Sequence, residues 1–206
     1  MRKSFLINGI LAVLILMLCG GTLFAATPLA AIRDSNNRVK AVLDENKGKK
    51  LDAVTEERLK VLISQATDFS AMSDAVLTVF PDTITAAQRA AFKRSFEELL
   101  LLSSVKKMGR YSADRFEYGA ERVQGSSATV NTVAIYTKND GRVDRVRLDY
   151  ALELKNGRWM IVNYFMDGIS TIRNYQQQFR SLIRARGIDG VIQHVQRTVE
   201  RYRIED

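Results

Sequence analysis

Two periods of hydrophobic and polar residues follow one another along this chain of 206 residues. From residue 28 to about residue 107, hydrophobic residues recur every three or four positions, which is the spacing of amphipathic helices. A Thr85–Gln88 pair at capping-box spacing marks the start of the longest of these helices. The pattern predicts helices over 28–46, through 59–66, from a cap at Ser70 to about Phe80, and from Thr85 to about Lys107.

After Gly109 the period becomes two, which is the spacing of strands. The third predicted strand alternates most regularly, so we expect it to have one dry face and one solvated face, with Asp149 on the solvated face. The fourth is hydrophobic on both faces, and we expect it to lie centrally in the sheet. The pattern predicts strands over 115–122, 128–137, 142–154 and 159–166, with a hairpin turn at Asn156–Gly157.

The stretch 159–179 joins the sheet to the helices that follow it. It breaks at Asp167–Gly168, restarts at Ser170 as an amphipathic helix, and that helix ends at Gly187 before a last one. Helices, an antiparallel meander and further helices together indicate an α+β fold in which helices wrap a curved antiparallel sheet. We expect a single domain over 26–206, made of an N-terminal helical part (26–108), the meander (109–168) and C-terminal helices (169–206).

The first 25 residues have the features of a signal peptide. Arg2 and Lys3 precede an almost continuous hydrophobic run over 5–18, and small residues follow up to Ala25 and Ala26. We expect cleavage after Ala25 or Ala26 and export to the periplasm; a retained membrane anchor is the alternative. Cys19 is the only cysteine, so the mature chain must rely on its core for stability.

The chain is basic, with 31 lysines and arginines against 23 aspartates and glutamates. Without Arg2 and Lys3 the net charge is about +6, which favours anionic surfaces such as phospholipid head groups. Ordinary solubilising charge is the alternative. The export signal and the lack of a recognition module argue against a nucleic-acid partner.

The sequence offers little that could carry catalysis. His194 is the only histidine, which excludes a histidine metal site or a histidine-based triad, and we expect it at the surface or half-buried. Asp149 and Asp167 are the acids nearest to the hydrophobic face. Each could be a general base in a pocket, but Asp149 also fits a solvated position and Asp167 a turn. We expect no catalytic residue, no metal and no cofactor.

Two parts of the sequence resemble a known family. The run Trp159…Gly168-Ile169-Ser170…Asn174-Tyr175…Phe179, followed by Gly187-Ile188-Asp189-Gly190, resembles the C-terminal signature of the MlaC, or toluene-tolerance, family. Upstream, Gln88-Arg89, Phe92, Phe96 and Leu99-Leu100 are similar to that family's Q-R-x-x-F-x-x-x-F-x-x-L-L helix. The resemblance covers nearly the whole chain after the signal peptide. One departure is Gln176, where the family usually has an arginine.

This resemblance implies a periplasmic phospholipid carrier with a curved sheet of the nuclear-transport-factor-2 (NTF2) type. Such a carrier shuttles lipid between an outer-membrane lipoprotein complex and an inner-membrane ABC transporter that holds an MCE-domain protein. This transport maintains the lipid asymmetry of the outer membrane. The acyl tails would lie in an apolar pocket and the head group at its mouth. We expect bound phospholipid as cargo, no enzyme activity and a monomer.

Physical chemistry agrees with that implication. Two acyl chains in water cost on the order of 20 kcal/mol, so a carrier needs apolar walls and no nucleophile. Two alternatives stay open: a pocket enzyme of the isomerase or dehydratase type that uses Asp167 or Tyr150, and a periplasmic adaptor with a solid core and no ligand. The candidate wall residues lie on the third strand, on the fourth strand and at the break after it: Leu148, Tyr150, Leu152, Val162, Tyr164, Met166, Ile169 and Tyr175.

Overall fold

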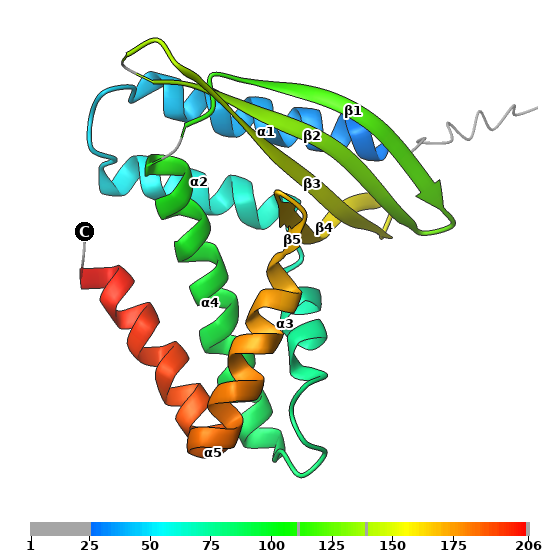
Figure 1. The fold of residues 1–206 in the computed structure, drawn as a ribbon, viewed down its shortest axis with the longest axis vertical. Helices are drawn as coiled ribbons and strands as arrows, with labels where there is room; N and C mark the ends of the chain where they lie inside the picture. The colour runs from blue at the N-terminus through cyan, green and yellow to red at the C-terminus, as the bar shows by residue number, and fades with distance from the viewer. Residues whose placement is uncertain (1–25, 111, 139, 205–206) are drawn as a thin grey trace, which may run out of the picture.

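The computed structural model describes residues 26–110, 112–138 and 140–204, which form five helices and one five-stranded sheet (Figure 1). The predicted signal peptide lies outside the described residues. The prediction of an α+β fold with a curved antiparallel sheet is confirmed, and the strand order is β1-β2-β3-β4-β5. The elements are α1 Pro28–Glu45, α2 Ala53–Ala66, α3 Phe69–Leu77, α4 Ala86–Arg110, β1 Arg115–Gln124, β2 Ser127–Thr137, β3 Val143–Lys155, β4 Arg158–Met166, β5 Ile169–Ser170 and α5 Thr171–Ile204.

Side-chain caps determine where the helices begin. The predicted capping box of α4 is confirmed, because Gln88 N donates to Thr85 Oγ1 and Thr85 N donates to Gln88 Oε1, both at 3.1 Å. The predicted cap of α3 is wrong by two residues. Asp68, and not Ser70, is the cap, since Asp68 Oδ1 accepts a hydrogen bond of 2.8 Å from Ala71 N. Aspartate is as good an N-cap as serine, so the pattern alone did not separate the two.

Two tight turns shape the end of the sheet. Asn156 and Gly157 both have positive φ, 51° and 75°, which confirms the predicted hairpin between β3 and β4. Asp167 and Gly168 also have positive φ, 49° and 81°, at the predicted break. This second turn brings the chain back as β5, a two-residue strand that pairs with the end of β4. The chain therefore makes one more strand than the pattern predicted.

The prediction that the fourth strand lies centrally and is covered on both sides is confirmed only in part, because β4 lies between β3 and β5 but β5 is very short. Strand β4 pairs with β3 along its length but with β5 over only two residue pairs. The junction between α2 and α3 covers part of the remaining edge, because Asp68 N donates a hydrogen bond of 2.8 Å to Ile161 O. Helices α2, α3 and α5 all contact β4. This covering explains why β4 is hydrophobic on both faces although it has only one full-length neighbour.

Three clusters of buried hydrophobic residues hold the elements together. One lies among α3, α4 and α5, where the rings of Phe92 and Phe96 are 5.1 Å apart and Phe179 meets Phe92 at 5.5 Å. The second lies between α1 and the sheet, and the third among α1, α2 and α4. Helix α5 bends at Gly187 (φ 67°, ψ −175°), which confirms the predicted break and lets both limbs pack beside α4 (Figure 1). Among the described residues, no helix is long and apolar enough to cross a membrane.

Candidate functional site

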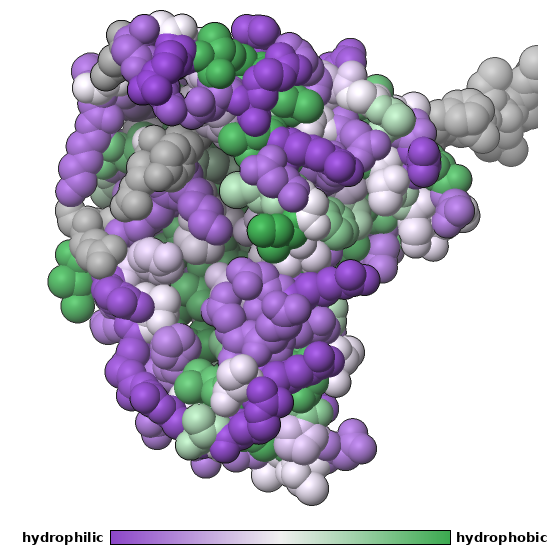
Figure 2. Space-filling view, in the orientation of Figure 1, coloured by the Kyte–Doolittle hydropathy of each residue, from purple (hydrophilic) through white to green (hydrophobic). Residues whose placement is uncertain are grey.

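A cavity of about 650 Å³ lies between the sheet and the helices α2, α3 and α4. Strands β2, β3 and β4 supply one wall, with Tyr136, Val146 and Leu148 among its side chains. Ile63 of α2 and Met108 of α4 belong to the opposite wall. In Figure 2, hydrophobic side chains are visible in the hollow between the sheet above and the helices below. The cavity is therefore built from segments that are far apart in the sequence.

Helix α1 explains why only part of the sheet borders a cavity. Ile32 of α1 packs against Val130 and Leu152, and it fills the space over that end of the sheet. Toward the other end of the same strands, Tyr136 and Val146 border the cavity instead. The inner face of the sheet is thus divided into a half packed against α1 and a half that stays open.

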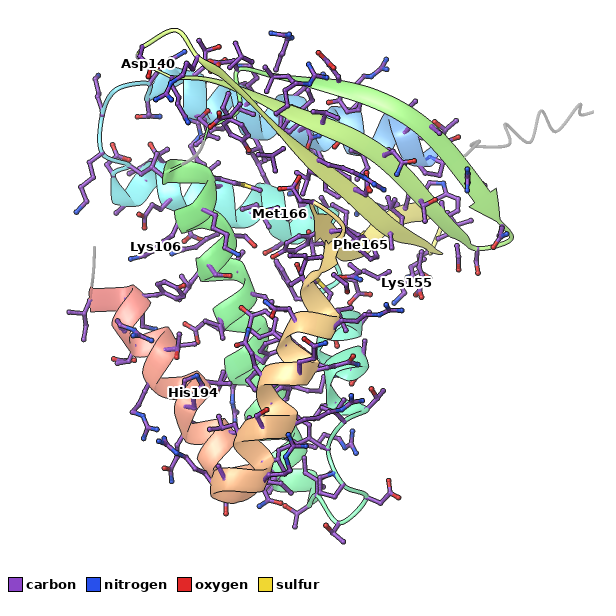
Figure 3. All side chains as sticks on the ribbon, viewed as in Figure 1. Lys106, Asp140, Lys155, Phe165, Met166 and His194 are labelled. Atoms are coloured by element: carbon purple, nitrogen blue, oxygen red, sulfur yellow. The ribbon has the colours of Figure 1, made fainter. Side chains whose placement is uncertain are left out.

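An irregularity in β4 decides which of its side chains face the cavity. In the pairing with β3, Ala151 lies opposite Asn163 but Leu152 lies opposite Ile161, so Val162 is an extra residue. Side chains alternate along a strand, and one extra residue reverses that alternation. Ile161 therefore shares the cavity face with Tyr164 and Met166. Figure 3 labels Met166 and its neighbour Phe165, which lie on opposite sides of the strand.

Four of the eight predicted wall residues line the cavity: Leu148, Tyr150, Tyr164 and Met166. Whether these side chains touch a ligand stays a prediction.

The other four lie outside the lining of the cavity. Leu152 is packed against α1, and Val162 is the extra residue of β4. Tyr175 stacks edge-on against Phe96 at 4.9 Å in the helical core, where burial raises the pKa of its phenol to about 12. Ile169 is 65% exposed and forms a cross-strand pair with Met166, so it lies beside the cavity rather than in it.

The two ends of the cavity differ in polarity. Ile63 and Ile161 at the inner end are buried. The charged residues among the described lining, Lys107, Lys138 and Asp144, are all exposed. Lys138 Nζ lies 2.8 Å from Asp144 Oδ2. The arrangement is an apolar interior with a charged mouth.

Two buried hydroxyl groups of the lining, those of Ser104 and Tyr150, are already hydrogen-bonded within the protein. Ser104 Oγ donates to Leu100 O at 2.7 Å, within α4. Tyr150 Oη donates to Asn36 Oδ1 at 3.3 Å, and burial raises the pKa of this phenol well above its usual value. A neutral hydroxyl that is bonded to a neighbouring helix contributes to the shape of the wall and not to proton transfer.

Neither of the two carboxylates considered as general bases lines the cavity. The prediction that Asp149 is solvated is wrong, because Arg147 lies against it with an Nη2–Oδ2 distance of 2.5 Å and only 6% of the residue is exposed. Burial alone would raise the pKa of Asp149, but the hydrogen bond and charge of Arg147, together with hydrogen bonds from Asn131 and the Thr132 backbone, outweigh it and the pKa is lowered. Asp167 occupies the predicted turn, where its Oδ1 accepts from Arg147 N at 3.0 Å.

The lone histidine and the side chains that could bind a metal are further candidates for chemistry in the described part of the chain. His194 is exposed on the second limb of α5, as predicted (Figure 3). In residues 26–110, 112–138 and 140–204, no group of three or more His, Cys, Asp and Glu side chains is placed to hold a metal ion.

Several residues that line the cavity were not among the wall residues predicted from the sequence. Val146 continues the alternation of Leu148 and Tyr150, and Tyr136 has the same parity on β2 as the buried Val130, so the period of two could have found both. Ile63 and Met108 had no such signal. On a helix, a residue that borders a cavity has the same hydrophobic spacing as one that packs in the core.

A second hollow, of about 760 Å³, is an open groove between α1 and α2. Two of its residues, Val54 and Val61, are 71% and 47% exposed, and Arg38 and Arg58 stand at its edges. Although its volume is larger, it is a surface groove in which Val42 is the one buried residue of the described lining. The cavity under the sheet is the better enclosure for an apolar ligand.

Comparison with known proteins gives one matching family model and several similar solved structures. The family model described as MlaC protein matches residues 33–197. The phospholipid-binding protein from Ralstonia solanacearum, solved in complex with a phospholipid, is 19% identical, with a TM-score of 0.68 over 86% of this chain and 99% of that chain. An iota-carbonic anhydrase from a cyanobacterium, complexed with bicarbonate, is 17% identical, with a TM-score of 0.42 over 80% of this chain and 96% of that chain.

Proposed function

The chain belongs to the MlaC family, and we propose that it is a periplasmic phospholipid carrier that encloses acyl tails in the cavity under the sheet. It would shuttle lipid between an outer-membrane lipoprotein complex and an inner-membrane ABC transporter with an MCE-domain protein, and so maintain outer-membrane lipid asymmetry. The observation that carries this proposal is the cavity itself, with its apolar interior and charged mouth.

The size and polarity of the cavity support lipid tails as its contents. Its volume of about 650 Å³ lies within the range of roughly 300–1,000 Å³ that ligand pockets occupy. Each buried methylene gains about 0.8 kcal/mol, so an apolar interior holds tails without any specific bond. The similar fold of a protein that was solved with a phospholipid supports the same assignment here.

The mouth supports a position for the head group. Lys107 and Lys138 are exposed at the rim, where an ammonium group can meet a lipid phosphate while the tails extend inward. Lys138 is already paired with Asp144, so Lys107 is the stronger candidate for the phosphate.

The same geometry weighs against the two alternative functions. A pocket enzyme needs a general base in the cavity, but Asp149 and Asp167 lie outside it and Tyr150 is bonded to Asn36. An adaptor with a solid core would leave no cavity between the sheet and α4. Both features favour a binding protein without catalytic residues, metal or cofactor.

The direct test is to purify the protein, denature it, extract it with organic solvent and analyse the extract by mass spectrometry. Near-stoichiometric phospholipid is the expected result. A different amphiphile, such as a hopanoid, would change the proposed cargo. An empty extract, both as purified and after incubation with phospholipid vesicles, would contradict the proposal and favour the adaptor.

A further inference from the structure

We propose that the first limb of α5, residues 171–186, is a docking surface for an anionic phospholipid bilayer, beside the mouth of the cavity. This inference rests on the proposed function, because a carrier must meet a bilayer to take up or release its lipid. It assigns that contact to a particular face of the molecule.

Most of the net positive charge of the chain lies in α5. The helix contains seven arginines and only two acidic residues, Asp189 and Glu200. The whole chain has a formal net charge of +8. This one helix therefore accounts for more than half of the net charge of the chain. The positive charge is not spread evenly over the surface, as ordinary solubilising charge would be.

Three of these arginines form a stripe on the outer face of the first limb. Arg173, Arg180 and Arg184 are seven and four residues apart, which places them on one side of a helix. All three are exposed. The opposite side carries Tyr175 and Phe179, which pack against α4.

Several arginines of the chain have acidic partners, but those of the stripe have none among the described residues. Arg145 pairs with Glu117 at 2.5 Å and Arg203 with Glu98 at 2.6 Å. Within the part of the chain that the structure describes, Arg173, Arg180 and Arg184 form no ion pair with an acid. Guanidinium groups that are exposed and unneutralised are suited to bind phosphate oxygens from outside the molecule.

An exposed apolar pair adjoins the start of the stripe. Met166 and Ile169 are cross-strand neighbours and are 45% and 65% exposed. Met166 also lines the cavity, and Ser170, the residue after Ile169, accepts a hydrogen bond of 3.2 Å from Arg173 N at the start of α5. Apolar side chains beside arginines are typical of surfaces that lie at the bilayer interface.

This juxtaposition favours a bilayer over an acidic protein as the partner. A purely acidic protein surface would match the arginines alone and would leave the exposed Met166 and Ile169 in water. On a bilayer, these two side chains enter the head-group region while the stripe binds lipid phosphates. A lipid that leaves the cavity past Met166 would then reach the bilayer without crossing bulk water.

The test is co-sedimentation with two kinds of vesicle, pure phosphatidylcholine and phosphatidylcholine with about one third phosphatidylglycerol. The wild-type chain should bind the anionic vesicles and release them as salt is raised. The triple variant Arg173→Gln, Arg180→Gln, Arg184→Gln should lose roughly 100-fold in partition coefficient, if each arginine contributes as basic residues near a membrane usually do. The matched control loses three exposed arginines outside α5 that also have no acidic partner in the described part of the chain: Arg89→Gln, Arg94→Gln, Arg122→Gln.

Each outcome decides the proposal. A loss confined to the α5 variant supports it; an equal loss in both triple variants, or none in either, overturns it. If the α5 variant binds vesicles normally but no longer exchanges lipid with its membrane complexes, the stripe contacts a protein and the proposal is wrong. Lipid extraction from the same preparations separates the two claims, because an empty protein that still binds vesicles through the stripe contradicts only the proposed function.

Discussion

The Tyr150 hydroxyl donates a 3.3 Å hydrogen bond to Oδ1 of Asn36, a residue 114 positions earlier in the chain. Asn36 lies in α1, and Tyr150 lies where the packed half of the sheet meets the open half. Burial raises the pKa of the phenol, so it stays neutral throughout the physiological range. The bond fixes α1 on the sheet at the inner end of the cavity.

Tyr150→Phe should weaken the fold slightly and leave lipid binding intact. The variant loses one hydrogen bond between α1 and the sheet, which contributes about 1 kcal/mol to the free energy of unfolding. Urea denaturation measures that loss, and solvent extraction measures the phospholipid content. A folded variant without phospholipid would show that the hydroxyl contacts the cargo, contrary to our assignment.

Leu148→Arg should empty the cavity. The side chain of Leu148 borders the cavity, so an arginine there is accommodated without displacing core residues but places a charge where the tails lie. We expect the phospholipid extracted per protein to fall at least about tenfold. Val143→Arg is the matched control on the same strand, because Val143 is 54% exposed and lies outside the lining. Equal lipid content in the two variants would show that the side chain of Leu148 does not contact the acyl tails.

Substitutions of Asp167 separate a turn residue from a general base. Its φ of 49° lies in the left-handed region, which asparagine tolerates and valine does not. Asp167→Asn should keep both stability and lipid content, whereas Asp167→Val should lower the free energy of unfolding by about 1–2 kcal/mol. Thermal unfolding and lipid extraction measure these outcomes. If the Asn variant is stable and keeps its lipid but no longer supports lipid transport, the hypothesis that Asp167 is a catalytic base would have to be considered again.

The ion pair between Asp68 and Lys155 should make stability depend on acid pH. Burial opposes ionisation of Asp68, but Lys155 Nζ at 2.7 Å and Ala71 N at 2.8 Å outweigh it, so its pKa is lowered. The unfolded chain therefore takes up this proton at a higher pH than the folded chain. The contribution is complete above the unfolded pKa of about 4 and is lost as the pH falls through the lower folded value.

Asp68→Asn keeps a helix cap but removes the charge that Lys155 meets. Wild type should exceed the variant in free energy of unfolding by up to about 1 kcal/mol at neutral pH. The difference should stay constant from pH 7 to about pH 5 and shrink below about pH 4. Urea denaturation across this range measures it, and a difference that is unchanged down to pH 3 would disprove the linkage.

The fold was largely predictable because it depends on local signals. The change of period after Gly109, the Thr85–Gln88 capping box and the Asn156–Gly157 turn each depend on residues close together in sequence, and the structure confirms all three. The position of β4 was not predictable in the same way. Hydrophobic residues on both faces show that a strand is covered, but not whether a strand or a helix junction provides the cover.

The site was only partly predictable because its limits are set by contacts distant in sequence. The alternation on β3 correctly grouped Leu148, Tyr150 and Leu152 on one face, but only the position of α1 determines that Leu152 is packed while Leu148 borders space. The extra residue Val162 depends on the pairing of β4 with β3 and is invisible in the sequence of β4 alone. Asp149 is buried because Arg147 lies against it. The alternation of hydrophobic and polar residues along β3 does not indicate this contact.

Photo-cross-linking with a phospholipid that carries a diazirine on its acyl tail shows directly whether the tails lie in the cavity under the sheet. The lipid is loaded into the purified protein, irradiated, and the labelled residues are identified by mass spectrometry of peptides. We predict labels on the cavity wall, at Leu148, Ile161 and Tyr164. Labels concentrated at Val54 and Val61 would instead place the tails in the groove between α1 and α2 and contradict their enclosure under the sheet.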